Sequence, residues 1–140
     1  MILISHRGNI TGKSKNENHP NHIKNALLMG FNVEIDVWYK NKSFYLGHDK
    51  PQYKINKNYL LNSKLWCHAK NSNAVYELSK TNAHYFWHQK DDYTLTSKGF
   101  IWVYPNKKFF KNSIIVLTKK TEKLPTNCYG VCSDYVSNYK

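Results

Sequence analysis

The stretch Asn32-Val-Glu-Ile-Asp-Val-Trp38 decides how the rest of the chain is interpreted. Its alternation predicts a strand that carries Glu34 and Asp36 on one face and apolar residues on the other. Two neighbouring carboxylates repel each other, and burial raises their pKa values unless a positive charge lies between them. A divalent metal ion supplies that charge, because hard cations prefer oxygen ligands. The alternative is an exposed strand face that happens to be acidic.

The length and charge of the chain limit the classes of protein that fit it. Its 140 residues indicate a single domain, residues 1–140, with enough chain to bury a core. The net charge of +12, from 21 basic and 9 acidic residues, suggests an anionic partner: a nucleic acid, a phosphate ester or an acidic membrane surface. Codon bias in an AT-rich genome also explains the many lysines. They are spread along the whole chain without a dense block, which argues against a nucleic-acid partner.

Arg7 is the only arginine in the sequence. Arginine binds phosphate or carboxylate through a planar fork of N–H donors that lysine cannot reproduce. A lone arginine in a chain that otherwise uses lysine therefore suggests a site that needs this fork, with chance as the alternative.

The cysteines and the apolar runs bear on the compartment. Cys67, Cys128 and Cys132 are an odd number and form no Cys-x-x-Cys pair, which favours a reducing compartment. We interpret Cys128 and Cys132 as packing residues beside a strand, with a zinc site as the alternative. The sequence shows neither a signal-peptide pattern nor an apolar segment long enough to span a membrane, so we expect a cytoplasmic protein.

The pattern along the chain predicts short strands with few helices. We expect strands at residues 2–5, 32–38, 43–47, 65–70, 84–88, 100–104, 113–117 and 129–134. Helices are expected at 20–29, where Pro20 suits the first turn and Gly30 the end, and at 72–80. Residues 50–63 and 91–99 are expected to be loops with at most one helical turn. The order strand, loop, helix, strand at the start implies a parallel β–α–β unit.

Chemically useful side chains recur at the carboxyl ends of these strands. They are His6, Arg7, Glu34, Asp36, His48, His68, Lys70, His88 and Asp134. In parallel α/β barrels the loops after the strands form the active-site face. Such a set could cleave a phosphodiester, with one histidine deprotonating the nucleophile and the other protonating the leaving oxygen. Arg7 and a divalent ion would hold the phosphoryl oxygens, Lys70 would add positive charge, and His88 would line the substrate pocket.

Four segments in residues 2–49 carry a resemblance to a known family. They are Ser5-His6-Arg7-Gly8, Glu17-Asn18, Gly30-Phe-Asn-Val-Glu34-Ile-Asp36-Val37 and Leu46-Gly-His48-Asp49. Their order and spacing resemble the glycerophosphodiester phosphodiesterases, within the phosphatidylinositol-phospholipase-C-like phosphodiesterases. The resemblance implies that His6 and His48 form the acid/base pair and that Arg7 contacts phosphate. It also implies that Glu34 and Asp36 bind Mg²⁺ or Ca²⁺.

Two departures from the family pattern matter. The family's fourth strand carries Glu-x-Lys, and its glutamate completes the metal site; this chain has His68-Ala-Lys70 instead. Imidazole as a ligand favours Mn²⁺, Zn²⁺ or Fe²⁺; alternatively, His68 contacts substrate. The chain is also shorter than ordinary (β/α)8 barrels, which exceed about 200 residues. We therefore expect an α/β fold: a reduced TIM-like (β/α)8 barrel with most outer helices shortened or missing.

Three classes of function follow from these observations. The first is a metal-dependent phosphoric diester hydrolase that cleaves a glycerophosphodiester to an alcohol and glycerol phosphate. In a variant of it, a hydroxyl group of the substrate attacks and a cyclic phosphate is released. The second is an inactive barrel that binds a phosphate ester or an anionic lipid. The third is a basic domain associated with nucleic acid, supported by net charge alone.

Overall fold

The computed structural model describes residues 1–120 and 122–140, and its central element is the strand that holds Glu34 and Asp36. Among these residues there are two α-helices, α1 (Pro20–Leu28) and α2 (Ser72–Ser79), and two short 3-10 helices, η1 (Lys57–Leu61) and η2 (Val136–Tyr139). The strands are β1 (Ile2–His6), β2 (Asn32–Lys40), β3 (Ser43–Leu46), β4 (Tyr53–Ile55), β5 (Leu65–Ala69), β6 (Tyr85–Trp87), β7 (Tyr93–Leu95), β8 (Ile101–Val103), β9 (Ser113–Leu117) and β10 (Gly130–Ser133).

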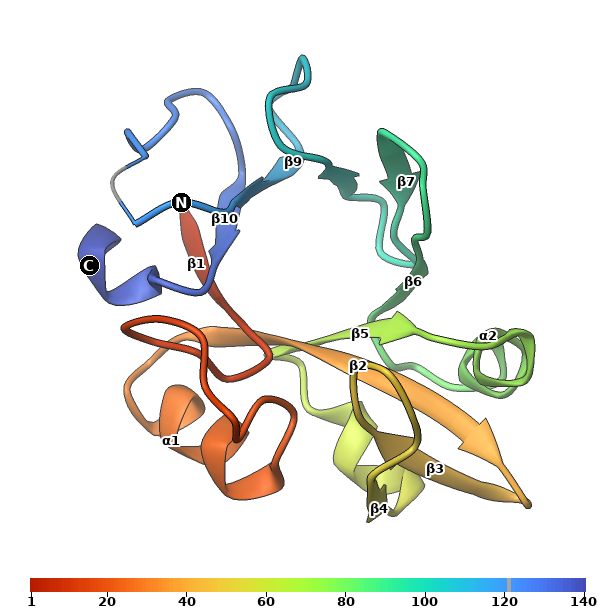
Figure 1. The fold of residues 1–140 in the computed structure, drawn as a ribbon. Coiled ribbons are helices and arrows are strands. Elements are labelled where there is room, and N and C mark those ends of the chain that lie inside the picture. The colour runs from red at the N-terminus through yellow and green to blue at the C-terminus, as the bar shows by residue number, and fades with distance from the viewer. Residues whose placement is uncertain (121) are drawn as a thin grey trace.

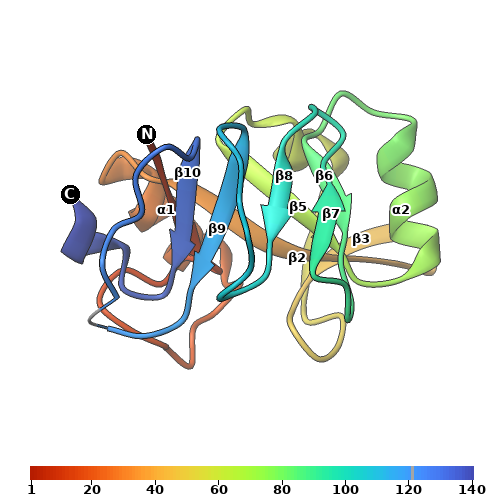
Figure 2. The same cartoon turned by 90° about the horizontal axis from the view of Figure 1, so that it is seen from above.

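All ten strands belong to one curled sheet. Its order is β4-β3-β2-β1-β10-β9-β8-β7, with β5 added to the other edge of β2 and β6 added to β5. The first part of β2 lies between β1 and β5, parallel to both, while its last residues pair antiparallel with β3. The carboxyl ends of β1, β2, β5, β6, β8, β9 and β10 therefore point the same way, which Figure 2 shows for β8, β9 and β10.

The expected (β/α)8 barrel is wrong: the structure is a mixed half-barrel with little helix. Figure 1 shows the strands curling around an axis while both α-helices lie outside, against β2 and β5. The pairs β2–β3, β3–β4 and β7–β8 are antiparallel, because a turn such as Asn41-Lys42 is too short for a crossover helix. Among the described residues no strand ladder joins β6 to β7. Only isolated hydrogen bonds bridge that seam, such as Thr94 Oγ1 to the Trp87 carbonyl at 2.7 Å.

Most of the expected elements are confirmed, and two strands were missed. The eight expected strands and two helices all occur, and none of their bounds shifts by more than two residues. The expected loops at 50–63 and 91–99, however, contain the three-residue strands β4 and β7. Both lie at a sheet edge and are only three residues long, which is too short for an alternation of apolar and polar residues to be recognised.

The ends of α1 follow from local chemistry. Pro20 occupies the first turn, and the His19 side chain accepts a hydrogen bond from the Asn21 amide at 3.1 Å. Gly30 follows the helix with φ of +93°, a conformation that a side chain disfavours. The chain therefore turns immediately after the helix and enters β2, which begins at Asn32.

The sheet buries apolar residues on both of its faces. On the outer face Val33, Ile35 and Val37 of β2 pack in one cluster with residues of α1 and α2. Inside the curl a second cluster fills the space, and it consists of Ile4, Trp66, Phe86, Trp102, Ile114 and Cys132. Because neighbouring residues of a strand point to opposite faces, Glu34 and Asp36 point inward with this second cluster. The sheet thus places two carboxylates inside the curl, near its carboxyl edge.

Candidate metal and phosphodiester site

Glu34 and Asp36 are buried in the structure. Their exposed fractions are 2% and 0%. Glu34 Oε2 and Asp36 Oδ1 accept no hydrogen bond from any described residue. Leaving buried carboxylate oxygens without donors is costly, so these two atoms mark a place where a positive ligand would be stabilised.

His68 completes the cluster from the neighbouring strand. Asp36 and His68 are paired residues of β2 and β5, which puts their side chains on the same face of the sheet. His68 Nδ1 lies 3.5 Å from Glu34 Oε1 and 3.3 Å from Asp36 Oδ1. Ligand atoms of Glu34, Asp36 and His68 all lie within 4.8 Å of one another, so the group could hold a metal ion. This confirms that the three residues expected to bind metal come together.

Contacts on the side of the ring away from the carboxylates fix the orientation of His68. Its Nε2 atom donates a hydrogen bond to the His88 carbonyl at 2.7 Å, and the ring stacks on Phe86 with centroids 5.1 Å apart. Since Nε2 carries the proton of this bond, Nδ1 of the neutral ring presents its lone pair to the carboxylates. A metal-ligating histidine is held in this way, with the other ring nitrogen donating to a carbonyl group.

Several cations balance the charge of Asp36. Arg7 Nε lies 2.9 Å from Asp36 Oδ2, and Lys70 Nζ lies 3.6 Å from Oδ1. Burial alone raises the pKa of Asp36, but His48, His68 and Arg7 outweigh it and hold the pKa well below its ordinary value. Asp36 is therefore an anion in the folded protein at neutral pH.

Asn18 fixes the position of Asp36 through both ends of its amide. Its Nδ2 donates to Asp36 Oδ2 at 2.8 Å, and its Oδ1 accepts from the Asp36 amide at 2.9 Å. Asn18 has φ of +63°, a conformation that asparagine tolerates better than most residues. The loop before α1 thus reaches into the cluster.

His6 and Asp134 form a hydrogen-bonded pair beside Glu34. His6 Nδ1 lies 2.7 Å from Asp134 Oδ1, and His6 Nε2 lies 3.7 Å from Glu34 Oε2. Burial lowers the pKa of His6, but the bond to Asp134 and the charge of Glu34 outweigh it, so the net pKa is raised. Asn9 is buried next to this pair and donates to both Asp134 Oδ1 (2.8 Å) and Glu17 Oε1 (2.9 Å).

His48 approaches Asp36 from the loop after β3. Its Nδ1 lies 3.4 Å from Asp36 Oδ2, and its Nε2 lies 3.6 Å from Asp49 Oδ1. The side chain is 42% exposed, so it can exchange protons with solvent. The two histidines expected to act as acid and base therefore contact different members of the carboxylate pair.

The remaining expected residues line two cavities over the cluster. Arg7, His68, His88 and Tyr104 line both of them. Lys70 lines one, and His88 stands just after β6 with a buried Nδ1 that has no partner among the described residues. The structure thus brings together all nine strand-end residues that the sequence predicted for the site, Asp134 included.

Sequence reasoning missed several residues that shape this site. Asn9 gave no signal because asparagines are common in this chain; in the structure it is completely buried, as Asn18 is. Trp102 and Tyr104 carry no signal in the sequence that assigns them to the site, yet both line a cavity at the cluster. Asp134 was expected on this face from its position at a strand end, but no sequence signal pairs it with His6.

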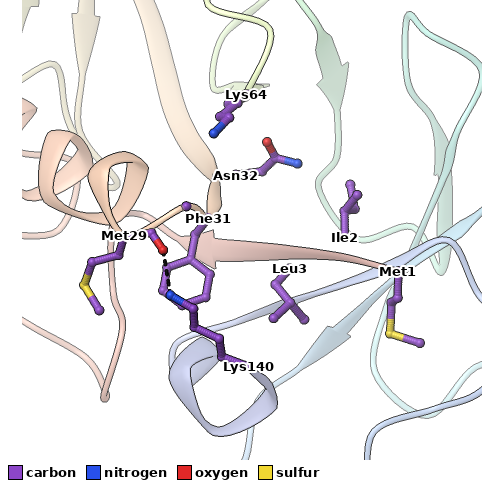
Figure 3. Close-up of a pocket in the computed structure, with 9 residues that line it drawn as sticks. Met1, Ile2, Leu3, Met29, Phe31, Asn32, Lys64 and Lys140 are labelled. Carbon is purple, nitrogen blue, oxygen red and sulfur yellow. Dashed lines mark hydrogen bonds between the residues drawn. The ribbon is translucent and has the colours of Figure 1, made fainter.

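Another cavity, of about 510 Å³, lies at the opposite end of the strands. Figure 3 shows Phe31 and Leu3 in its wall, with Lys64 and Lys140 on different sides of it. Lys140 Nζ donates to the Met29 carbonyl at 2.9 Å. No histidine, aspartate or glutamate is among the described residues that line this cavity, so it lacks the side-chain types proposed for the acid/base pair and the metal site.

Searches of protein-family models, curated proteins and solved structures found no match to this chain. Within the described residues, no helix has the length and apolar character needed to cross a membrane.

Proposed function

We propose that the protein is a metal-dependent phosphodiester hydrolase whose acid and base are His6 and His48. The observation that carries the proposal is the buried cluster of Glu34, Asp36 and His68, whose ligand atoms lie within 4.8 Å of one another. Glu34 Oε2 and Asp36 Oδ1 accept no hydrogen bond from a described residue. Two further histidines contact this pair, which places candidate acid and base groups directly beside the candidate metal ligands. The resemblance over residues 2–49 supports a glycerophosphodiester as the substrate.

Glu34, Asp36 and His68 would hold the ion. Three protein ligands leave further positions for water or substrate, as catalytic sites require. Two oxygen donors and one imidazole suit Mn²⁺ or Zn²⁺ better than an all-oxygen site would. When bound, the ion would polarise the phosphoryl group and offset the charge that develops on it.

Arg7 would bind the phosphoryl oxygens. Its Nη1 is engaged with Glu17 at 3.1 Å and its Nε with Asp36 at 2.9 Å, which orients the guanidinium plane. Arg7 also lines both cavities, so its guanidinium is at hand for a phosphate that binds there. A guanidinium fixed in this manner requires little reorganisation as charge develops in the transition state.

The two histidines would move the protons of the reaction. His6, whose raised pKa favours the protonated ring, would give its Nε2 proton to the leaving alkoxide. His48, exposed to solvent, would accept a proton from the attacking water. Water oxygen bonds to phosphorus, the ester P–O bond breaks, and the products are an alcohol and a phosphate monoester.

A metal-free binding function is the second candidate, because His68 itself can balance the carboxylates. Burial lowers the pKa of His68, but Asp36 and Glu34 outweigh it and raise that pKa to about 9. A protonated His68 between the two carboxylates takes the place of a cation. Arg7 and Lys70 would then bind a phosphate ester without turnover.

Turnover by chelator-stripped protein distinguishes the two candidates. Glycerophosphocholine and a chromogenic phosphodiester are supplied as substrates, and Mg²⁺, Ca²⁺, Mn²⁺ or Zn²⁺ is added back separately. We expect Mn²⁺ or Zn²⁺ to restore activity and Glu34→Gln to lower it by roughly 100-fold or more. Glu77→Gln, at a carboxylate of α2 that pairs with Lys80, is the matched control. Turnover that survives both chelation and Glu34→Gln would exclude the proposed hydrolase.

A further inference from the structure

The two cavities over the cluster differ sharply in their linings. One has a volume of about 220 Å³ and the other about 330 Å³. They share Arg7, His68, His88 and Tyr104, so they meet above the candidate metal ligands. Only His6 of the acid/base pair lines the first, and only His48 lines the second.

The first cavity, which we call the Trp102 cavity, has a largely apolar wall. Trp102, Pro105 and Val116 line it, with Thr118 at its edge. Trp102 is 4% exposed and stacks on Phe86 at 4.5 Å between centroids, and Phe86 in turn stacks on His68. The wall is therefore a rigid aromatic surface, which stabilises apolar groups by excluding water.

The second cavity, which we call the Lys70 cavity, is polar. Its own lining residues are His48, Ala69, Lys70 and Gln89. Lys70 Nζ is 3.6 Å from Asp36, and Gln89 is exposed with an amide that can donate and accept hydrogen bonds. This lining suits hydroxyl groups and offers no extended apolar wall.

We propose that the two cavities hold the two alcohol groups of one phosphodiester, an apolar alcohol against Trp102 and a hydroxyl-bearing alcohol against Lys70 and Gln89. The proposal rests on the proposed hydrolase function, and it specifies both the substrate class and its orientation. The phosphate lies where the cavities meet, beside Arg7. A symmetric diester with two glycerol groups leaves the Trp102 wall unused.

This orientation decides which ester bond breaks. Because His6 lines only the Trp102 cavity, it protonates the oxygen of the apolar alcohol, and that P–O bond breaks. His48 accepts the proton of the water whose oxygen bonds to phosphorus. The hydroxyl-bearing alcohol stays on the phosphate as a monoester in the Lys70 cavity.

Two synthetic substrates test the proposal: benzyl glyceryl phosphodiester and methyl glyceryl phosphodiester. Their leaving groups are both primary alcohols and their glyceryl groups are identical, so they differ in the apolar group alone. We expect wild-type protein with Mn²⁺ to release benzyl alcohol and glycerol phosphate, identified by phosphorus NMR. Release of benzyl phosphate and glycerol instead would overturn the orientation.

Substitutions in each cavity test its separate contribution to substrate binding. Val116→Thr keeps the shape of the side chain and adds a hydroxyl, so it should raise KM for the benzyl substrate by roughly tenfold and leave KM for the methyl substrate within twofold. Gln89→Ala should raise KM equally for both, since both carry glycerol. Leu95→Gln, at an exposed position of β7 that lines neither cavity, is the control and should change neither value.

Calorimetry with benzyl phosphate and methyl phosphate distinguishes failure of this inference from failure of the hydrolase. If no diester is cleaved but Val116→Thr still weakens binding of benzyl phosphate alone, the hydrolase function fails and the apolar subsite stands. If both diesters are cleaved and Val116→Thr affects them equally, the hydrolase stands and the apolar subsite is overturned.

Discussion

At the scale of single residues, the candidate site depends on how partners orient each histidine. His68 donates to a backbone carbonyl, and His6 is held by Asp134 at 2.7 Å. Each ring therefore has one nitrogen committed to the protein and the other facing the carboxylates of β2. Such partners influence activity without contacting substrate.

Asp134→Asn tests the partner of His6. Loss of the carboxylate removes the interaction that raises the pKa of His6, so that pKa should fall, as followed by NMR titration of the ring. Turnover should drop by roughly 10- to 100-fold at neutral pH while the fold persists. Asp92→Asn, at an exposed carboxylate that pairs with Lys107, is the control. An unchanged titration of His6 would contradict the assigned role.

The burial of His84 should make the free energy of unfolding depend on pH. Burial, with a smaller effect of Lys98, lowers the pKa of His84 to about 4, and its Nε2 lies 2.8 Å from Thr96 Oγ1. In the unfolded chain the ring has an ordinary pKa near 6.5, so below that pH the unfolded state binds more protons than the folded state. The contribution of neutral His84 is therefore complete above about pH 7 and is lost as pH falls toward 4.

Urea unfolding of wild type and His84→Gln at pH 7.5 and pH 5 measures this effect. The free energy of unfolding of wild type relative to the variant should fall by roughly 2 kcal/mol on acidification, because glutamine does not titrate. Comparing the two proteins cancels the titration of all other groups. A constant difference across this range would show that His84 titrates normally in the folded state.

At the scale of elements, the sequence predicts strands well where their side chains are buried. The alternation of Asn32–Trp38 and the apolar runs at 65–70 and 113–117 correspond to β2, β5 and β9. β4 and β7 were not predicted because a strand of three residues is too short to show a hydrophobic period. The grouping of Glu34 and Asp36 with His68 followed from strand positions, since parallel neighbours share a face.

The pairing of β1 with β10 depends on a glycine. A Cβ at Gly130 would lie 2.5 Å from Ile2 Cγ1 and 2.6 Å from the Ile2 carbonyl oxygen, so Gly130→Ala must push the two strands apart. We expect a loss of roughly 2–3 kcal/mol in the free energy of unfolding, measured with urea.

Gly99→Ala is the matched control for this substitution. Its Cβ would meet no atom within 4 Å, although φ of +83° makes it cost about 1 kcal/mol. Equal losses at the two positions would show that the close approach of β1 and β10 does not matter.

At the scale of the whole molecule, the sequence predicts most of the strands and helices but not whether the sheet closes into a barrel. The resemblance implied a barrel, whereas the structure is a half-barrel without a ladder between β6 and β7. Whether the strands on the two sides of this seam pair depends on how strongly the whole sheet curls. A local sequence pattern does not predict that curvature. Asn9 shows the same limit within the site, because its partner Asp134 lies 125 residues away.

Amide hydrogen exchange should show a gradient across the sheet. Amides of β1, β2 and β10, which have paired neighbours on both edges, should exchange slowest. Amides of β4, β6 and β7, each of which is paired along one edge only, should exchange fastest. Equal protection of β6, β7 and β1 would mean that the seam is closed in solution.

The cations around Asp36 have a consequence for the protein in the cell. Because Arg7, Lys70 and a protonated His68 lie against the buried carboxylates and offset part of their charge, we expect the chain to fold without the proposed ion. A shortage of metal would then leave the number of folded molecules unchanged, but their metal sites would be unoccupied. If the proposed function holds, the supply of the ion, and not the stability of the folded chain, would set the fraction of molecules that can hydrolyse substrate.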